Sequence, residues 1–530
     1  MTRTLAIGMD GATFTILDQM VEELPGLGLA MPFMKKIFEG GARSRLLSTP
    51  NPLTPPAWVS FMTGRTPGNH GVYDFIRMEE KGDDVFYTLY DARDVQTEMI
   101  WSIATRSGKK VVALNYPFTA PPRPNTGSLV PGFTHWKHLR RSTSPPELYE
   151  RLKEMPDFSP KNLAWDFEHE KQIMEALGQG ELADWIRYHI RRDEHWLAVA
   201  EKLLVEDQPD LMAVLFDGTD KLQHQIYYYL DPNLTPEEPS DAYLELRALS
   251  FEYFRKLDSW IERLVELAGP DTQVFLNSDH GFTASFEVVR INAYLADRGY
   301  LVLKAGDGLE DGRPTSTWFA NVDFTKTRAY CPTPSSNGIV IRVASKPGEP
   351  GIAPEEYEAF RDQLIADLYD LRDAVTGEQI IKAVRKREEI YNGPALADAP
   401  DLTLTLRDHG FVSIRDVRPV VEKRPEPLGT HHPEGVFLAY GPGIRPGYLG
   451  PLHQIADVPA TLLYSLGLPI PDNFEGKVAQ DFFNDEYLMV NPVRTGSAAL
   501  TGKGASEENA MDEAEKAKLL EQLQMLGYVE

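Results

Sequence analysis

The stretch LMAVLFDGTDKLQH, residues 211–224, decides the fold class of this chain. Leu211–Phe216 is apolar at every position, which is typical of a strand buried on both faces. Four similar runs are separated by helical stretches: Leu5–Met9, Val111–Asn115, Gln273–Asn277 and Val436–Tyr440. This alternation predicts an α/β fold with a mainly parallel sheet sandwiched by helices.

Carboxylates and histidines follow three of these runs. Asp10 ends the first strand, Asp217 and Asp220 follow LMAVLF, and Asp279 and His280 end the strand in VFLNSDHGF. In open sheets of this kind, ligands bind beyond the carboxyl ends of the strands. We therefore expect these side chains to face one cleft.

The spacing of two pairs adds detail. Asp220 and His224 are four residues apart at the start of a helix, so they share one face and can hold one ion. The alternative is an ordinary surface pair. Asp279 and His280 can both face a cleft only where the strand breaks, and Gly281 permits that break.

Two further candidates lie near Pro-rich or Gly-rich segments. Thr54 precedes Pro55-Pro56 and the helical run AWVSFMTG, so it caps this helix, acts as a nucleophile, or does both. His431 is expected in a loop before the strand GVFLAY, and its neighbour His432 is a competing candidate.

Together the candidates comprise three Asp, three His and one hydroxyl, which is the inventory of a two-metal hydrolytic site. They are Asp10, Thr54, Asp220, His224, Asp279, His280 and His431.

Five segments occur along the chain in this order: GMDG, LTPPAWVSFMTGRTPGNHGVYDF, FDGTDKLQH, SDHGF and GTHHPEG with its trailing GPGI. Together they resemble the type I phosphodiesterase/nucleotide pyrophosphatase branch of the alkaline phosphatase superfamily. The resemblance covers residues 1–135, 206–300 and 390–480. It implies an alkaline phosphatase-like fold and a phosphate-ester hydrolase with a small phosphorylated substrate.

The resemblance also implies roles for the candidate residues. One zinc ion would be held by Asp220, His224 and His431, and a second by Asp10, Thr54, Asp279 and His280. Thr54 would attack phosphorus and form a covalent phosphothreonine. Three histidines suit zinc, and the carboxylates also allow manganese.

The chain departs from this family at one position. In this family the nucleophilic threonine is followed three residues later by an Asn that binds a phosphoryl oxygen. In this chain, the residue three positions after Thr54 is Ala57. Asn115, Lys221 or His432 could supply the missing donor. Asn115 could equally be a turn residue.

Several alternatives compete with a phosphodiesterase or nucleotide pyrophosphatase. A phosphomonoesterase, or a phosphotransferase of the phosphoglycerate mutase type, would use the same scaffold. However, residues 140–205 are too short for the transferase domain of such a mutase. A sulfatase is disfavoured because Cys331-Pro332-Thr333-Pro334 lacks its nucleophile pattern. A non-catalytic, metal-binding relative that recruits a partner protein is disfavoured by the intact ligand set.

The sequence predicts six segments: a catalytic core in residues 1–139, 206–295 and 426–492, a helical insert in 140–205, a mixed α+β cap in 296–425, and a tail in 493–530. The cap is expected to contain strands at Leu301–Lys304 and Gly338–Val343 and a helix at Pro354–Leu371. The tail is expected to be a flexible linker followed by an amphipathic helix that could mediate homo-oligomerisation. His70 and His409 are interpreted as loop residues.

Composition excludes some classes of partner. The chain has 530 residues, 54 Lys and Arg and 79 Asp and Glu, giving a formal net charge of −25. This charge disfavours nucleic-acid polymers and anionic membranes, which require a basic surface. A single cysteine, Cys331, excludes an intramolecular disulfide. With no signal peptide or long apolar run expected, a cytoplasmic location is predicted.

Overall fold

The computed structural model describes residues 3–81, 84–164, 179–304, 319, 322–333, 335–346, 348–415 and 417–502, with backbone only at 78–81, 84–87 and 179. These residues form two compact units. Unit 1 contains the described residues of 3–72, 91–283 and 431–502, and unit 2 contains those of 73–90 and 284–430.

Unit 1 is built on a nine-stranded sheet in the order β17-β2-β16-β8-β1-β7-β5-β6, with β18 also paired to β2. The strands are β1 (Thr4–Met9), β2 (Ala42–Leu47), β5 (Val111–Leu114), β6 (Ser128–Val130), β7 (Leu211–Phe216), β8 (Gln273–Asn277), β16 (Glu434–Tyr440), β17 (Tyr448–Leu449) and β18 (His453–Gln454). The five strands from β8 to β6 are parallel, whereas β16 is antiparallel to both of its neighbours. The predicted mainly parallel sheet is therefore confirmed, with one reversed strand.

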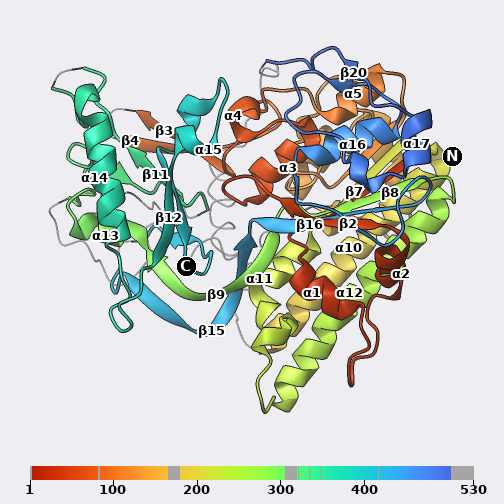
Figure 1. Ribbon diagram of the computed structural model, residues 1–530, viewed down its shortest axis with the longest axis horizontal. Helices are drawn as coiled ribbons and strands as arrows, with labels where there is room; N and C mark the ends of the chain where they lie inside the picture. The colour runs from red at the N-terminus through yellow and green to blue at the C-terminus, as the bar shows by residue number, and fades with distance from the viewer. Residues whose placement is uncertain are drawn as a thin grey trace. The chain divides into compact units, whose positions relative to one another are not determined.

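Helices cover both faces of this sheet (Figure 1), as expected for strands that are apolar throughout. Helices α3, α5 and α16 pack together on one face, and α2, α10 and α12 on the other. The long helices of unit 1 are α2 (Pro32–Gly40), α3 (Thr54–Thr63), α10 (Gln179–Asp207), α11 (Gly218–Leu230), α12 (Asp241–Ala268) and α16 (Asp457–Ser465). The shorter ones are α1 (Phe14–Met20), α4 (Pro67–His70), α5 (Ile100–Arg106), α6 (Leu139–Ser142), α7 (Pro146–Leu152), α8 (Pro160–Leu163) and α17 (Asp485–Val490), with 3-10 turns η1 (Trp136–His138), η2 (Pro232–Leu234) and η5 (Gln480–Phe482).

Unit 2 has its own hydrophobic core, formed by residues such as Ile291, Tyr330, Ile339, Leu364 and Leu402. Its sheets have the orders β10-β11-β13-β12 and β14-β9-β15, and β3 and β4 form a separate hairpin. The strands are β3 (Ile76–Lys81), β4 (Asp84–Leu89), β9 (Gly281–Arg290), β10 (Ala329–Tyr330), β11 (Gly338–Ile341), β12 (Ile381–Lys386), β13 (Leu402–Leu406), β14 (Val412–Ser413) and β15 (Val421–His432). The helices are α13 (Ile291–Asp297), α14 (Tyr357–Tyr369) and α15 (Arg387–Ile390), with 3-10 turns η3 (Pro354–Glu356) and η4 (Leu396–Asp398).

The structure differs from the sequence-based division in three places. Residues 73–90, assigned to the core from sequence, group with unit 2, and Tyr73 and Asp74, which precede the β3–β4 hairpin, form hydrogen bonds within that unit. The expected strand at Leu301–Lys304 is absent, and Leu303 forms only an isolated bridge to Val322.

The third difference concerns the expected linker. Thr495–Gly496 forms β20, which pairs with β19 (Ile470–Pro471), and the Ala499 amide donates to Asn473 at 2.8 Å. Small polar composition therefore failed to reveal a segment that is tied to unit 1 by backbone hydrogen bonds. The predicted C-terminal helix, residues 510–530, and the oligomer contact assigned to it lie outside the described residues.

No helix among the described residues is both long enough and apolar enough to span a bilayer.

Candidate active site

The register of three parallel strands places the first acidic candidates in one row. Gly8 of β1 pairs with Leu215 of β7 and with Asn277 of β8. Two residues further along each chain, Asp10, Asp217 and Asp279 therefore leave the sheet at the same level. This is the carboxyl edge, at which the sequence predicted a cleft.

Glycines allow the chain to turn at this edge. Gly11 has a φ of +65°, and a Cβ there would lie 2.5 Å from the Phe282 ring. A Cβ on Gly281 would lie 2.1 Å from the carbonyl oxygen of Glu434. Gly281 is thus required by a close backbone approach beside the Asp279-His280 bend, and larger residues at either glycine would displace the site.

His431 reaches the same edge from the opposite chain direction. Sequence analysis placed it in a loop, but it lies in strand β15, which ends at His432, just before β16. Because β16 runs antiparallel to β8, its beginning lies beside the end of β8. His431 therefore precedes its strand of the large sheet, whereas the other candidates follow theirs.

Thr54 is the first residue of helix α3, and Leu53 occupies the cap position. The prediction that Thr54 caps the helix is therefore wrong: no side chain caps it. The Thr54 hydroxyl oxygen lies instead 3.3 Å from His280 Nε2. A hydroxyl in the first turn of a helix lies in the positive field of the helix dipole, which favours its deprotonated form.

Two groups of possible ligands share His280: Asp220, His280 and His431 form one, and Asp10, Asp279 and His280 form the other. In the first group, His431 Nε2 lies 3.1 Å from Asp220 Oδ1. In the second, His280 Nε2 lies 3.2 Å from Asp279 Oδ2 and 3.6 Å from Asp10 Oδ1.

His224 adjoins the first group. Its Nε2 lies 3.1 Å from His431 Nε2 and 3.5 Å from Asp220 Oδ1. The structure thus brings all seven predicted side chains together, while His280 lies between the two groups rather than in one alone.

Backbone carbonyls orient two of the imidazoles. His431 Nδ1 donates to the Pro52 carbonyl at 2.7 Å, and His280 Nδ1 donates to the Gly281 carbonyl at 3.1 Å. A hydrogen bond at Nδ1 leaves the Nε2 lone pair available, as in metal-binding histidines. Their rings stack with centroids 3.5 Å apart, and the Nε2 atoms of His431 and His280 lie 3.1 and 3.2 Å from carboxylate oxygens of Asp220 and Asp279.

Two of the three carboxylates, those of Asp10 and Asp279, are poorly compensated by the protein. Asp10 and Asp279 are fully buried. Burial, followed by repulsion from Asp279 and Asp220, raises the pKa of Asp10 well above its ordinary value. Burial raises the pKa of Asp279 to about 8 and lowers the pKa of His280 well below its usual range. Negative charge in this site therefore requires a cation that the side chains do not supply.

Sequence analysis did not identify Trp58, which holds Asp10, one of the candidate ligands. Its indole Nε1 donates to Asp10 Oδ2 at 3.0 Å. Trp58 lies four residues after Thr54 on α3, so the two side chains share a helix face. That spacing could have indicated Trp58 from sequence.

The predicted substrate-binding residues lie in different surroundings. Asn115 donates to Asp217 Oδ1 at 3.0 Å, and Lys221 Nζ lies 3.8 Å from Asp217 Oδ2. Arg192 of α10 also donates to Asp217. We call these four buried residues the Asp217 cluster. His432 is partly buried and accepts the Glu434 amide at 3.1 Å.

His70 was interpreted as a loop residue, and this is wrong. It ends helix α4, is fully buried, and lies 3.0 Å from the Ser60 hydroxyl. Burial lowers its pKa to about 3, so it is a neutral structural histidine. His409 does lie in a loop.

Buried carboxylates and imidazoles gathered around a hydroxyl are typical of metal-dependent hydrolases. The profile of the type I phosphodiesterase / nucleotide pyrophosphatase family matches residues 4–434, and the chain belongs to this family. It is thus a metal-dependent hydrolase that acts on phosphate-ester bonds. No curated protein matches the chain in sequence.

Solved structures share the fold. Murine ectonucleotide pyrophosphatase/phosphodiesterase 5 is 16% identical with a TM-score of 0.51, over 91% of this chain and 100% of that one. An inactive threonine-to-alanine variant of that murine protein, in complex with AMP, is 15% identical with a TM-score of 0.50, over 91% and 100%. Phosphonoacetate hydrolase from Sinorhizobium meliloti 1021, in complex with phosphonoformate, is 15% identical with a TM-score of 0.51, over 88% and 95%.

Proposed function

We propose that this hydrolase cleaves phosphodiesters or nucleotide-type esters, with Thr54 as nucleophile and two divalent ions, zinc in preference to manganese, at the two ligand groups. The observation that carries the proposal is the position of the Thr54 hydroxyl, 3.3 Å from the His280 nitrogen that both groups share. The AMP complex of the inactive threonine variant of a structural neighbour supports the same substrate class and nucleophile.

The residues present fit divalent ions. Among the described residues, Asp10 Oδ1 and Asp279 Oδ2 are buried and have no hydrogen-bond partner. Such orphaned carboxylate oxygens are costly unless a cation binds them. Three imidazoles suit zinc, and the oxygen-rich second group also suits manganese.

In the proposed reaction, the Thr54 oxygen attacks phosphorus while the bond to the departing alcohol breaks. The hydroxyl proton ends on that alcohol, and a phosphothreonine remains. A water molecule then attacks phosphorus, and the Thr54 oxygen departs and regains a proton. Bound metal ions would supply electrostatic stabilisation of the attacking and departing oxygens.

His280 and Trp58 fix the positions of the groups around the reaction centre. His280 lies beside the Thr54 hydroxyl, and its ring is fixed by the Gly281 carbonyl and by stacking on His431. Trp58 holds Asp10 from the same helix that presents Thr54. Side-chain orientations fixed before substrate binds lower the cost of reaching the transition state.

The diester preference rests on charge. A monoester dianion carries one more negative charge than a diester, and dedicated monoesterases of this superfamily meet it with a third metal or an arginine. Among the described residues, only two groups of three or more ligands are close enough to hold an ion. A diester monoanion is therefore the better match.

The test is kcat/KM on bis-p-nitrophenyl phosphate against p-nitrophenyl phosphate, with metal content measured on the same protein. We expect the diester to be preferred and Thr54→Ala to remove both activities. A tenfold or greater preference for the monoester, about 1.4 kcal/mol of transition-state binding, would assign the enzyme to the phosphatases instead. Stoichiometric metal without turnover of either ester would indicate a non-catalytic relative.

A further inference from the structure

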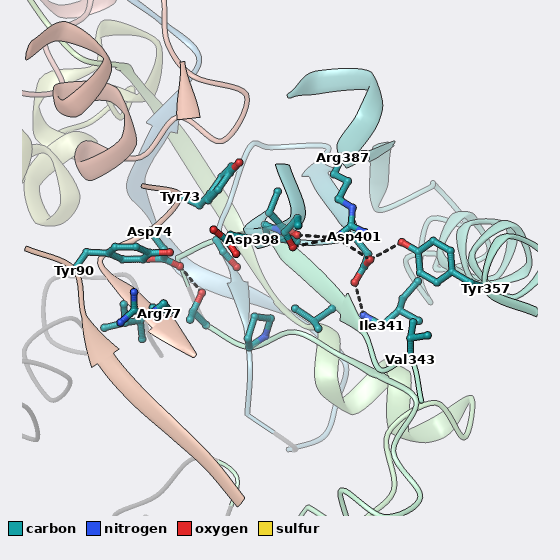
Figure 2. Close-up of a pocket in the computed structure, with 18 residues that line it drawn as sticks. Tyr73, Asp74, Arg77, Tyr90, Ile341, Val343, Tyr357, Arg387, Asp398 and Asp401 are labelled. Atoms are coloured by element: carbon teal, nitrogen blue, oxygen red, sulfur yellow. Dashed lines mark hydrogen bonds and ion pairs between the residues drawn. The ribbon is translucent and has the colours of Figure 1, made fainter. Parts of the chain in front are cut away.

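Unit 2 contains a cavity of about 450 Å³ that the proposed function does not use. All of its lining residues belong to unit 2, and none is a candidate metal ligand. In the view of Figure 2, Tyr73, Tyr90 and Arg77 lie on one side, and Arg387 and Tyr357 lie on the other. The volume falls within the range of small-molecule sites.

The two buried aspartates of the cavity accept hydrogen bonds from other groups of the protein. Asp74 accepts hydrogen bonds from the hydroxyls of Thr333, at 2.5 Å, and Ser335, at 2.7 Å. Asp401 accepts from the Ile341 amide at 2.7 Å and from the Tyr357 hydroxyl at 2.5 Å. These carboxylates therefore brace the walls through hydrogen bonds from neutral donors.

Arg387 is held more loosely. Its contacts with Glu388, Ala397, Ala399 and Asp401 are all 3.4 Å long and involve only Nε and Nη1. Charge-assisted hydrogen bonds are normally about 2.7–2.9 Å long. Among the described residues, Nη2 makes no hydrogen bond, so the guanidinium group keeps donors for a ligand.

Tyrosine rings form the other wall. Tyr73 is fixed by a hydrogen bond from its hydroxyl to the Ala395 carbonyl, at 2.8 Å, and by edge contact with Tyr391. The Arg77 guanidinium lies over the Tyr90 ring, 5.7 Å from its centroid. Aromatic rings and guanidinium planes both bind flat ligands.

We propose that this cavity binds a small organic anion with a planar ring. The ring packs against Tyr73 and Tyr90, and the phosphate or carboxylate pairs with Arg387 across the cavity. The exposed carboxylate of Asp398, which also lines the cavity, disfavours a ligand with several negative charges. The ligand is therefore of nucleoside monophosphate or aromatic carboxylate type, and its site is separate from the metal ligands.

The test is calorimetric titration with AMP and with benzoate, which present the phosphate and the carboxylate form of this chemistry. The protein is chelator-treated and carries His280→Ala, so that the proposed active site does not contribute. We expect at least one of the two anions to bind. If AMP binds, adenosine alone and inorganic phosphate alone should each bind more weakly than AMP. Absence of binding by both anions would overturn the proposal.

Substitutions of residues that line the cavity test whether the anion binds there. Arg387→Met should weaken binding at least tenfold, and Val343→Trp, which fills the cavity from a half-exposed position, should abolish it. The control is Arg372→Met, an exposed arginine of unit 2 outside the cavity. Unchanged binding in both Arg387→Met and Val343→Trp would refute the site, whatever the outcome of the esterase assays. Val343→Trp removes no polar contact, so it remains informative if Arg387→Met is unstable.

Discussion

Thr54 differs from the other hydroxyl residues of its helix. Ser60 and Thr63 donate to the carbonyls of Pro56 and Val59, four residues earlier, whereas Thr54 lies in the first turn and contacts His280. We expect Thr54→Ala to lower kcat at least about 10³-fold, as for loss of a nucleophile, without changing the unfolding transition. Thr54→Ser should retain part of the activity, and Thr63→Val is the matched control. Near-normal kcat in Thr54→Ala would exclude it as the nucleophile.

Arg192 is the nearer of the two cations that compensate Asp217 in the Asp217 cluster, the other being Lys221, and both Arg192 and Asp217 are almost fully buried. Removing one partner of a buried ion pair leaves an uncompensated charge, which costs about 3–5 kcal/mol. We expect Arg192→Met to lower the free energy of unfolding by this amount in urea titrations. Arg187→Met is the control, because Arg187 lies on the same helix and pairs with Asp184 at the surface, where a pair contributes less than about 1 kcal/mol. Equal losses in the two variants would contradict the argument.

The Asp217 cluster also shows where sequence reasoning ends. Asn115 and Lys221 were predicted as candidates to contact substrate, Asn115 because it follows a strand end on the active-site edge. Whether they do so stays a prediction, but their polar atoms lie near Asp217. Arg192, which completes the cluster, comes from a helix whose charged sequence resembles any solvated surface. Periodicity cannot reveal that one arginine of such a helix is buried.

At the scale of elements, strand direction explains which positions at the site could be predicted from sequence. The apolar strands that precede Asp10, Asp220 and Asp279 are parallel to one another. Because all three strands end at the same edge of the sheet, the residues that follow them could be recognised as site candidates. The reversal of β16 could not be inferred from its apolar pattern, which is the same for either direction. The sequence therefore predicted His431 as a candidate but placed it in a loop rather than at the end of β15.

His453 connects three short elements of unit 1. It lies in β18, 3.2 Å from Asp481 of η5 and 3.7 Å from Asp457 of α16. Burial alone would lower its pKa, but Asp457 and Asp481 raise it to about 9. Because the folded pKa lies above the unfolded value of about 6.5, the stabilisation is complete below pH 6.5 and is lost as the pH rises through 9.

We therefore expect the free energy of unfolding to fall between about pH 6.5 and 9, by at most about 3.4 kcal/mol at 1.36 kcal/mol per pKa unit. Denaturant titrations at several pH values measure the slope, and His453→Gln should reduce it in this window. A slope that is identical in the two proteins would show that other groups cause it.

At the scale of the whole molecule, the candidate metal site places several carboxylates in the interior of a chain that already carries a net charge of −25. Repulsion between Asp10, Asp279 and Asp220 opposes folding when no cation is bound. A divalent ion that binds only the folded state stabilises it by RT ln(1 + [L]/Kd), about 2.7 kcal/mol at a free concentration of about 100 times Kd. We expect chelation to lower the melting temperature, and zinc or manganese to restore it. The control is Asp10→Asn/Asp279→Asn: it removes both negative charges, so it should melt higher than the chelated wild type and respond less to added metal. A wild-type melting temperature that is independent of chelator, or a double variant with an undiminished metal response, would show that these carboxylates do not hold the ions.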